Sequence, residues 1–165
     1  MKTVGTCRVA DALSEWGTHN TLWRAKRQIT DAAEGLDFAL TYYAPFVARI
    51  LMAEPFGCMR VEILPEDVPQ LVLYTGAQGD SVVALHDTQE RVRAMVVGEE
   101  RIVGPLTCTC QHEPIDPGGL RLIPPVVVFD GWNRLAAWIL HGVNGKVYPI
   151  TANVILTKHD ARPTK

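Results

Sequence analysis

Residues 126–138, with the sequence Val-Val-Val-Phe-Asp-Gly-Trp-Asn-Arg-Leu-Ala-Ala-Trp, carry the strongest structural signal in the chain. An apolar run typical of a buried strand stops at Asp130-Gly131, and apolar residues at helical spacing follow at once. The segment therefore predicts a strand, a tight turn and a helix N-terminus within a few residues. Backbone N–H groups without partners and the positive end of the helix dipole meet at such a point, which favours an anion such as phosphate.

Arg134 falls in the first turn of the predicted helix. A cation there opposes the helix dipole and destabilises the helix by roughly 0.3–1 kcal/mol. A bound anion would remove this conflict, and Gly131 would let the backbone approach it closely. The alternative is an ordinary Asp-Gly turn in which Asp130 only caps the helix. The pattern alone favours neither interpretation.

The composition is that of an ordinary globular protein, with 47% hydrophobic and 21% charged residues among 165. A formal net charge of -2 provides no overall attraction for nucleic acid or membrane, so such contacts would need a local patch. The first residues lack the apolar core of a signal peptide, and no apolar run approaches the roughly 18–20 residues that span a bilayer. We therefore expect a cytoplasmic protein with no membrane partner.

The patterns predict an α/β (α+β) fold in which an N-terminal helical region, residues 1–57, packs on a small mixed-sheet domain, residues 58–157, followed by a tail, 158–165. In the first region a helix is expected after Asn20 and is ended by Gly35, and an apolar segment over 36–52 is interrupted by Pro45. Asp87 is expected to cap a helix, with Glu90 completing a capping box. Strands are expected at 59–64, 71–75, 81–85, 101–108, 122–129 and 148–156, a helix at 132–141 and a mobile loop at 111–119.

The four cysteines are too few and too irregularly spaced for a disulfide scaffold. Cys108, Cys110 and His112 would face one way on a strand, as zinc ligands can. A tetrahedral zinc site needs a fourth ligand, however, and this spacing is not diagnostic. Buried or surface thiols are therefore the expected interpretation, and no metal site is assigned to them.

The stretch from Pro124 to Trp138, together with Gly142 and the segment 150–155, resembles the ParB/sulfiredoxin-like superfamily. Members show an apolar strand, an Asp-Gly-x-His-Arg turn, a Leu-Ala-Ala helix, a glycine and a closing strand. Residues 61–68 are similar to the opening strand and turn of such domains, so the resemblance covers approximately residues 59–156. It implies that the turn binds nucleotide phosphates, with ATP or another nucleotide and Mg²⁺ as cofactors, and that activities include phosphoryl transfer and nuclease action. The binding residues are then Asp130, Gly131, Trp132, Asn133 and Arg134.

Two residues of the turn depart from the family pattern. Trp132 stands where sulfiredoxins carry the reactive cysteine, so reduction of sulfinic acids is not expected. Asn133 replaces the usual histidine and cannot shuttle protons near neutral pH. Because no helix-turn-helix follows, the chain does not resemble a complete chromosome-partition protein. Its layout is closer to plasmid fertility-inhibition proteins of the Osa type, which implies ATPase and DNase activity directed against conjugative DNA transfer.

Other candidate residues each have an ordinary structural explanation. Basic residues at 24, 26, 27, 91 and 93 could contact a nucleic-acid backbone or simply be solvated. A divalent ion held with phosphates could use Asp130, Glu62, Asp87 or Glu90, and the spacing singles out none of them. Trp138 is expected in the core, whereas Trp132 could cover a nucleotide base or be core.

The leading hypothesis is a nucleotide-binding effector with ATPase and DNase activity in which Asp130, Asn133 and Arg134 are the catalytic residues. Its partners would be nucleotide, DNA and a component of a conjugation or secretion system. One alternative is a non-catalytic interaction or inhibitor protein that uses the ParB-like core as a scaffold. Another is a nucleotide-gated DNA-binding module without catalysis.

Overall fold

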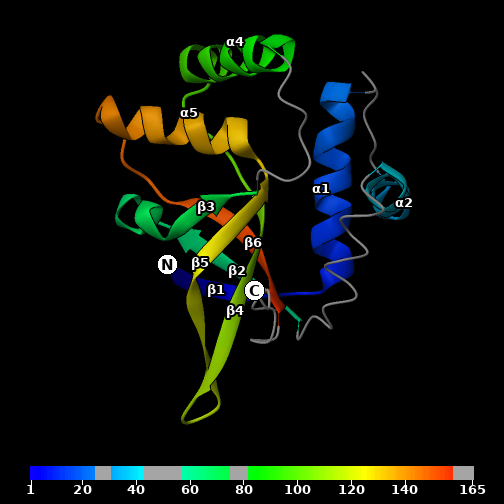
Figure 1. Ribbon diagram of the computed structural model, residues 1–165, viewed down its shortest axis with the longest axis vertical. Helices are drawn as coiled ribbons and strands as arrows, with labels where there is room; N and C mark the ends of the chain where they lie inside the picture. The colour runs from blue at the N-terminus through cyan, green and yellow to red at the C-terminus, as the bar shows by residue number, and fades with distance from the viewer. Residues whose placement is uncertain (25–30, 43–56, 75–81, 158–165) are drawn as a thin grey trace, which may run out of the picture.

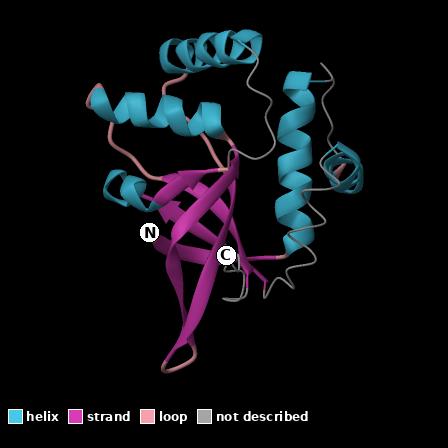
Figure 2. Cartoon of the chain, viewed as in Figure 1, coloured by secondary structure: helices cyan, strands magenta, loops and turns pink. Residues whose placement is uncertain are grey.

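The computed structural model describes residues 1–24, 31–42, 57–74 and 82–157 and contains a mixed six-stranded sheet flanked by helices (Figures 1 and 2). The elements in chain order are β1 (Lys2–Cys7), α1 (Val9–Arg24), α2 (Ala32–Tyr42), β2 (Gly57–Ile63), the 3₁₀ helix η1 (Pro65–Gln70), β3 (Leu71–Leu73), α4 (Val82–Gly98), β4 (Leu106–Ile115), β5 (Gly119–Asp130), α5 (Trp132–Val143) and β6 (Ile150–Thr157). The expected α/β (α+β) class is confirmed.

The strands lie in the order β1-β2-β6-β4-β5-β3. Pairing is antiparallel for β1 with β2, β2 with β6 and β4 with β5, and parallel for β4 with β6 and β3 with β5. The last strand of the chain is therefore inserted between β2 and β4 near the middle of the sheet. Among the described residues, no helix is long and apolar enough to cross a membrane.

The two faces of the sheet are covered by different helices. Alternate residues of the central strands, such as Val61, Cys108, Val128 and Val154, form the main core with α4 and α5. On the opposite face α1 packs against β2, β4 and β6 through a smaller apolar cluster that includes Leu13 and Trp16 (Figure 1). The alternation follows from the period of two along a strand.

The N-terminal region differs from the sequence-based expectation. It begins with β1, which the sequence analysis missed, and α1 starts at Val9 well before Asn20. Gly35 does not end a helix, because it lies inside α2 and is buried against α1. A Cβ atom on Gly17 would lie 1.8 Å from the Gly35 carbonyl oxygen, so these glycines set how closely the two helices approach. Pro45 lies outside the described residues.

The second half contains three further corrections. Residues 82–85 belong to α4 rather than to a strand, and Asp87 lies within that helix instead of capping it. The β-branched residues that suggested a strand are helical here because β propensity depends strongly on tertiary context. Residues 101–105 are not a strand, because β4 begins at Leu106. The expected strands at 59–64, 71–75, 122–129 and 148–156 correspond to β2, β3, β5 and β6, with shifts at their ends, and the expected helix at 132–141 corresponds to α5.

The expected mobile loop at 111–119 is instead the far end of a β-hairpin formed by β4 and β5. Residues Asp116, Pro117 and Gly118 form its turn, with Gly118 in the left-handed region at φ 72°. Pro124 and Pro125 lie opposite the register irregularity between Thr109 and Gln111. They are tolerated there because a proline in a strand is acceptable where ladder hydrogen bonds are interrupted.

Cys7 and Cys58 form a disulfide between neighbouring strands, with Cα atoms 5.0 Å apart. The bond joins the end of β1 to the start of β2 and closes a loop over 51 positions of sequence that contains α1 and α2. Spacing did not predict this pair, because only the β1–β2 register brings the two residues together. In a reducing cytoplasm both would be thiols.

We expect removal of this disulfide to lower the free energy of unfolding by about 2–4 kcal/mol, since a cross-link over a long loop restricts the unfolded chain. The measurement is urea denaturation with and without a thiol reductant, compared with a Cys7→Ser/Cys58→Ser variant. The double variant should match the reduced wild type and should not respond to reductant. Mass spectrometry that finds four free thiols in the oxidised protein would contradict the pairing.

The Gly17–Gly35 contact predicts that Gly17→Ala destabilises the protein by about 1–3 kcal/mol or more, because the added methyl group meets backbone that cannot move aside. Gly142→Ala is the matched control, since the space around Gly142 in α5 is open and alanine favours helix. Thermal unfolding should show a clear loss for Gly17→Ala and an unchanged or slightly higher stability for Gly142→Ala. Equal effects of the two changes would argue against close α1–α2 packing.

Candidate functional site

The turn between β5 and α5 has the compact geometry that the sequence predicts. Strand β5 ends at Asp130, Gly131 adopts the left-handed conformation at φ 92° and ψ 20°, and α5 starts at Trp132. The first intrahelical bond of α5 runs from the Leu135 N–H to the Gly131 carbonyl at 2.7 Å. The N–H groups of residues 132–134 precede this bond, and Gly131 at the N-cap position has no side chain that could accept a hydrogen bond from them.

Asp130 is not at the N-cap position of α5, which Gly131 occupies. Its carboxylate lies 3.0 Å from Nη2 of Arg134, and both side chains are mostly buried, with 19% and 15% of their surface exposed. Nη1 of Arg134 donates to the carbonyl oxygen of Pro105 at 2.7 Å. Arg134 thus joins the end of β5, the start of α5 and the segment before β4.

This arrangement changes the role expected of Arg134. The conflict between its charge and the helix dipole is relieved by the Asp130 carboxylate within the chain, so a ligand is not needed for that purpose. Two of the guanidinium nitrogens are engaged, and any contact with an anion would use the remaining N–H groups. Arg134 is therefore first a residue that positions the turn.

Trp132 and Asn133 complete the predicted set. The indole N–H of Trp132 donates to the Val128 carbonyl at 3.0 Å, and the ring packs against the main core. Trp132 is therefore folded back on β5. Asn133 is half-buried at the second position of α5, in the same turn as the backbone N–H groups that precede the first intrahelical bond. The structure thus brings all five predicted residues into one turn.

The other acidic and basic candidates lie on other elements or outside the described residues. Glu62 lies in β2, which is separated from β5 by β6 and β4. Glu90, Arg91 and Arg93 lie on α4. The side chains of residues 24, 26, 27 and 87 lie outside the described part of the chain. Within the described ranges no group of three or more potential ligands could hold a metal ion.

The three possible zinc ligands near residue 110 have different surroundings. Cys108 and Cys110 are buried in the main core. Burial raises the pKa of the Cys110 thiol to about 11, and burial raises that of Cys108 well above its usual range. His112 contacts the Thr157 carbonyl at 3.2 Å through Nδ1. Because zinc binds thiolates, such desolvated thiols do not favour a metal site.

A polar network between α1 and the sheet was not predicted from the sequence. Arg60 donates to Asn153 Oδ1 at 3.0 Å and to Glu15 Oε1 at 2.6 Å, and Asn153 donates to Glu15 Oε2 at 2.7 Å. Asn153 is fully buried, so this satisfied network fixes the position of α1 on the sheet. Its members are 45 to 138 positions apart in sequence, and no local pattern could have grouped them.

A buried histidine connects α5 with α4 and the segments before β4 and β6. His141 Nδ1 lies 2.6 Å from the Tyr148 hydroxyl, and Nε2 lies 3.3 Å from the Val96 carbonyl. The Tyr148 oxygen accepts the Ile102 N–H at 2.8 Å, so its proton is available to His141 Nδ1. This set of contacts is satisfied by a neutral imidazole with its proton on Nε2. His141 therefore has a structural role.

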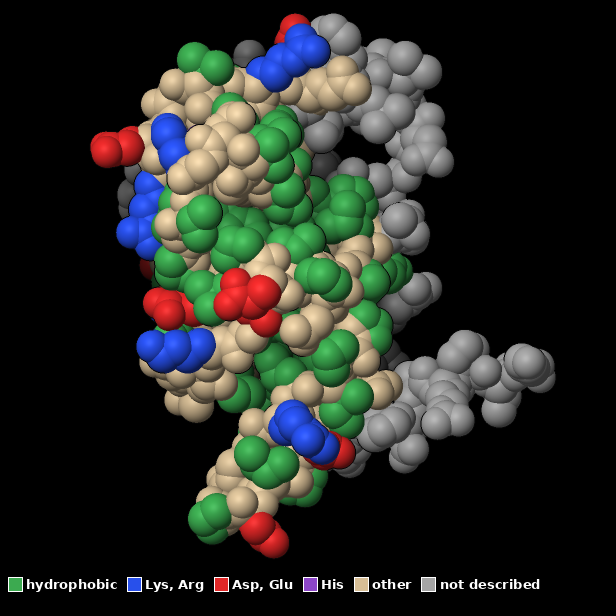
Figure 3. Space-filling model, turned by 90° about the vertical axis from the view of Figure 1, so that its left-hand side faces the viewer, with side chains coloured by type: hydrophobic (Ala, Val, Ile, Leu, Met, Phe, Trp, Pro, Cys, Tyr) green, Lys and Arg blue, Asp and Glu red, His purple; other side chains and the backbone are tan. Residues whose placement is uncertain are grey.

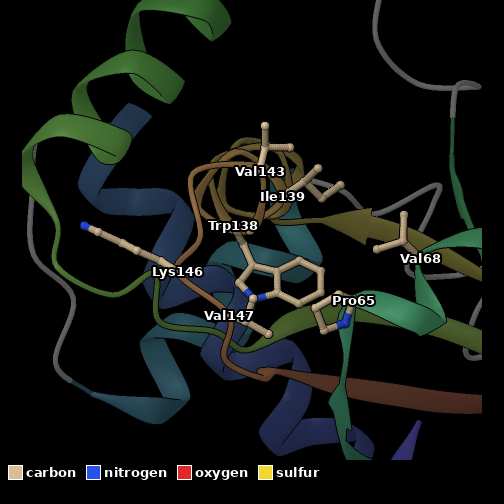
Figure 4. A pocket seen from close by; sticks show the side chains of 8 residues that line it. Pro65, Val68, Trp138, Ile139, Val143, Lys146 and Val147 are labelled. Atoms are coloured by element: carbon tan, nitrogen blue, oxygen red, sulfur yellow. The ribbon is translucent and has the colours of Figure 1, made fainter.

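A pocket of about 360 Å³ lies at the other end of α5, between this helix, η1 and the loop before β6 (Figure 4). It is lined by Pro65, Val68, Trp138, Ile139, Gly142, Val143, Lys146 and Val147. The Trp138 indole N–H donates to the Tyr148 carbonyl at 2.8 Å, and the side chain is almost fully buried, as expected for a core residue. No local sequence pattern predicts this pocket, because its lining residues come from separate segments of the chain.

Comparison with known proteins found no match among protein-family models, curated proteins or solved structures. Membership of the ParB/sulfiredoxin-like superfamily therefore stays a prediction from the sequence.

We expect Gly131→Ala to destabilise the protein more than Gly145→Ala. Both glycines have a positive φ, which costs an alanine roughly 1–2 kcal/mol. At Gly131 a Cβ atom would also lie 2.5 Å from Leu106 Cδ2, whereas the space at Gly145 is open. In chemical denaturation, the free energy of unfolding of Gly131→Ala should be about 1–3 kcal/mol lower than that of Gly145→Ala. This difference measures the cost of the contact with Leu106, because both variants share the cost of the positive φ. Equal losses would mean that the turn is not packed as described.

Proposed function

We propose that this protein is a nucleotide-binding effector that holds phosphate at the N-terminus of α5 and hydrolyses ATP with Mg²⁺. The observation that carries the proposal is the N-terminus of α5 with a glycine, Gly131, at its N-cap position and the Asp130–Arg134 pair beside it. In this proposal the protein acts in the cytoplasm on conjugative DNA transfer or in conflicts between mobile elements, with DNA as a second substrate. These physiological features follow from the resemblance to Osa-type proteins.

The turn offers several donors to a phosphate group. The backbone N–H groups of residues 132–134 precede the first intrahelical bond, and the helix dipole adds a partial positive charge at the same point. The Asn133 amide can add a side-chain donor. Gly131 supports close approach of an anion to the backbone, because it carries no Cβ at the entrance to the helix.

The residues present fit Mg²⁺ only as a partner of the nucleotide. Mg²⁺ is commonly held by one or two carboxylates together with phosphate oxygens, and Asp130 is the carboxylate in this turn. Bound Mg²⁺ would neutralise charge on the phosphates during hydrolysis. Arg134 binds the Asp130 carboxylate, so the role of Arg134 in this proposal is to position that carboxylate. Asn133 would orient the phosphate.

A non-catalytic interaction protein is the second candidate. It is favoured by the internal contacts of Arg134 with Asp130 and Pro105 and by the bond from Trp132 to Val128, because both side chains are used to build the turn. Purified protein that binds no nucleotide yet captures one specific partner would favour this candidate. Salt-sensitive DNA binding that changes with nucleotide but gives no hydrolysis would instead favour the nucleotide-gated DNA-binding module.

The substitution Asn133→Asp should weaken phosphate binding without lowering the stability of the fold. A carboxylate in the first turn of α5 favours the helix by about 0.3–1 kcal/mol but repels a phosphate at the same point. We expect equal or higher stability and an affinity for ATP that is lower by at least about tenfold, or about 1.4 kcal/mol. Calorimetric titration with ATP and Mg²⁺ measures the affinity, and thermal unfolding without nucleotide measures the stability.

Asn144→Asp is the matched control, because it makes the same chemical change at the C-terminal cap of α5. It should leave the affinity for ATP unchanged. In wild-type protein, nucleotide at a hundred times its dissociation constant should stabilise the fold by about 2.7 kcal/mol. Equal ATP affinities of wild type and Asn133→Asp, or no stabilisation by any nucleotide, would refute a phosphate site at this turn.

A further inference from the structure

The pocket between the C-terminal end of α5 and η1 is surrounded by exposed aliphatic side chains. Both elements lie on the left-hand side of Figure 1, and Figure 3 shows this side with hydrophobic side chains across its middle. Among the lining residues, Ile139, Val143 and Val147 are 37%, 77% and 70% exposed. Exposed apolar residues that gather around a cavity are typical of a binding site. The cavity volume of about 360 Å³ lies at the lower end of the range for small-molecule sites.

The polar groups next to the interior of the pocket are already hydrogen-bonded within the chain. The Trp138 indole lies between α5 and η1 (Figure 4), and its N–H donates to the Tyr148 carbonyl at 2.8 Å. The carbonyl groups of residues 140–142, at the end of α5, accept N–H groups from residues 144–146. Pro65 has no backbone N–H to offer. Because a buried polar group without a hydrogen bond is costly, the part of a ligand that enters this pocket should be apolar.

Lys146 is the charged member of the lining. It contributes to the wall of the pocket, and its ammonium group points away from the indole (Figure 4), as expected of a lysine that lays its methylene groups on an apolar surface and keeps its charge in water. The acidic residues of η1, Glu66 and Asp67, do not line the pocket, and Asp67 pairs with the N-terminal amino group. A ligand with its apolar part in the pocket would leave its head group in water at the rim, where an ammonium group is available.

We propose that this pocket binds a small aliphatic carboxylate, with its alkyl chain against Trp138 and Val143 and its carboxylate beside the ammonium group of Lys146. The apolar lining selects the chain, because each methylene group that leaves water adds to the affinity. The ammonium group selects an anionic head group over a neutral or cationic one. The pocket lies at the opposite end of α5 from the phosphate site, so this proposal does not rest on nucleotide binding.

Calorimetric titration of the full chain with hexanoate, octanoate and decanoate tests the apolar part of the proposal. The affinity should rise by about fourfold with each added methylene group and should stop rising at the chain length that fills the cavity. Octanol and octylammonium, which carry the same alkyl chain as octanoate, test the head group. Octanoate should bind about two- to fivefold more tightly than octanol, and octylammonium should bind more weakly than octanol, because the contact with Lys146 is solvent-exposed.

Two variants locate the site. Val143→Asp should weaken octanoate binding by at least about tenfold, because it places a carboxylate against the alkyl chain. Val97→Asp is the matched control, since Val97 is an 88% exposed valine near the C-terminal end of α4 and does not line the pocket, and it should bind octanoate as wild type does. Lys146→Met removes the charge but keeps an apolar stem, so it should lower the affinity for octanoate to that for octanol. Thermal unfolding without ligand checks that each variant is folded.

The proposal is overturned if octanoate and decanoate do not bind wild-type protein up to their solubility limits. It is also overturned if folded Val143→Asp binds octanoate as tightly as Val97→Asp does, because the ligand would then lie elsewhere on the molecule. Equal affinities of wild type for octanoate, octanol and octylammonium would rule out a site for a carboxylate. None of these titrations contains ATP, so their failure and the failure of the nucleotide proposal are separate results.

Discussion

The insertion of β6 between β2 and β4 is the interaction on which the rest of the structure depends. The final strand pairs antiparallel with β2 over seven residues and parallel with β4, so it joins the β1–β2 pair to the β4–β5–β3 group. Without it, the two groups share no strand pairing. The core on one face and the α1 cluster on the other both include residues of β6. Assembly of the sheet therefore requires the last strand of the domain.

The same strand relates the helices to the candidate site. Asn153 in β6 binds both Glu15 of α1 and Arg60 of β2, which fixes α1 over one face. On the other face α5 packs against the core that β6 helps to form, with its N-terminus at the end of β5. Arg134 then links this N-terminus to Pro105, just before β4. The phosphate site that we propose is thus held by the β5–α5 turn and by the segment before β4, which lies 29 positions away in sequence.

The two ends of α5 have different properties, and this separation matters for function. The N-terminal end offers backbone donors, an amide and a carboxylate, which suit a charged ligand. The C-terminal end contributes to an apolar cavity with one lysine at its rim, which suits an alkyl chain with an anionic head group. Both features belong to one helix, α5, in which Trp138 is buried near the middle.

The sequence by itself determined the strand, turn and helix over residues 126–138, because apolar periodicity and an Asp-Gly turn act locally. It also indicated the α/β class and the core position of Trp138. Only the tertiary structure decided the partners of Arg134, since Pro105 is brought near by the sheet. Likewise, β1 is a short exposed edge strand with little apolar alternation, and Gly35 resembles a helix end until Gly17 is packed against it. The disulfide, the network around Asn153 and the pocket all depend on contacts between distant segments, which local patterns do not contain.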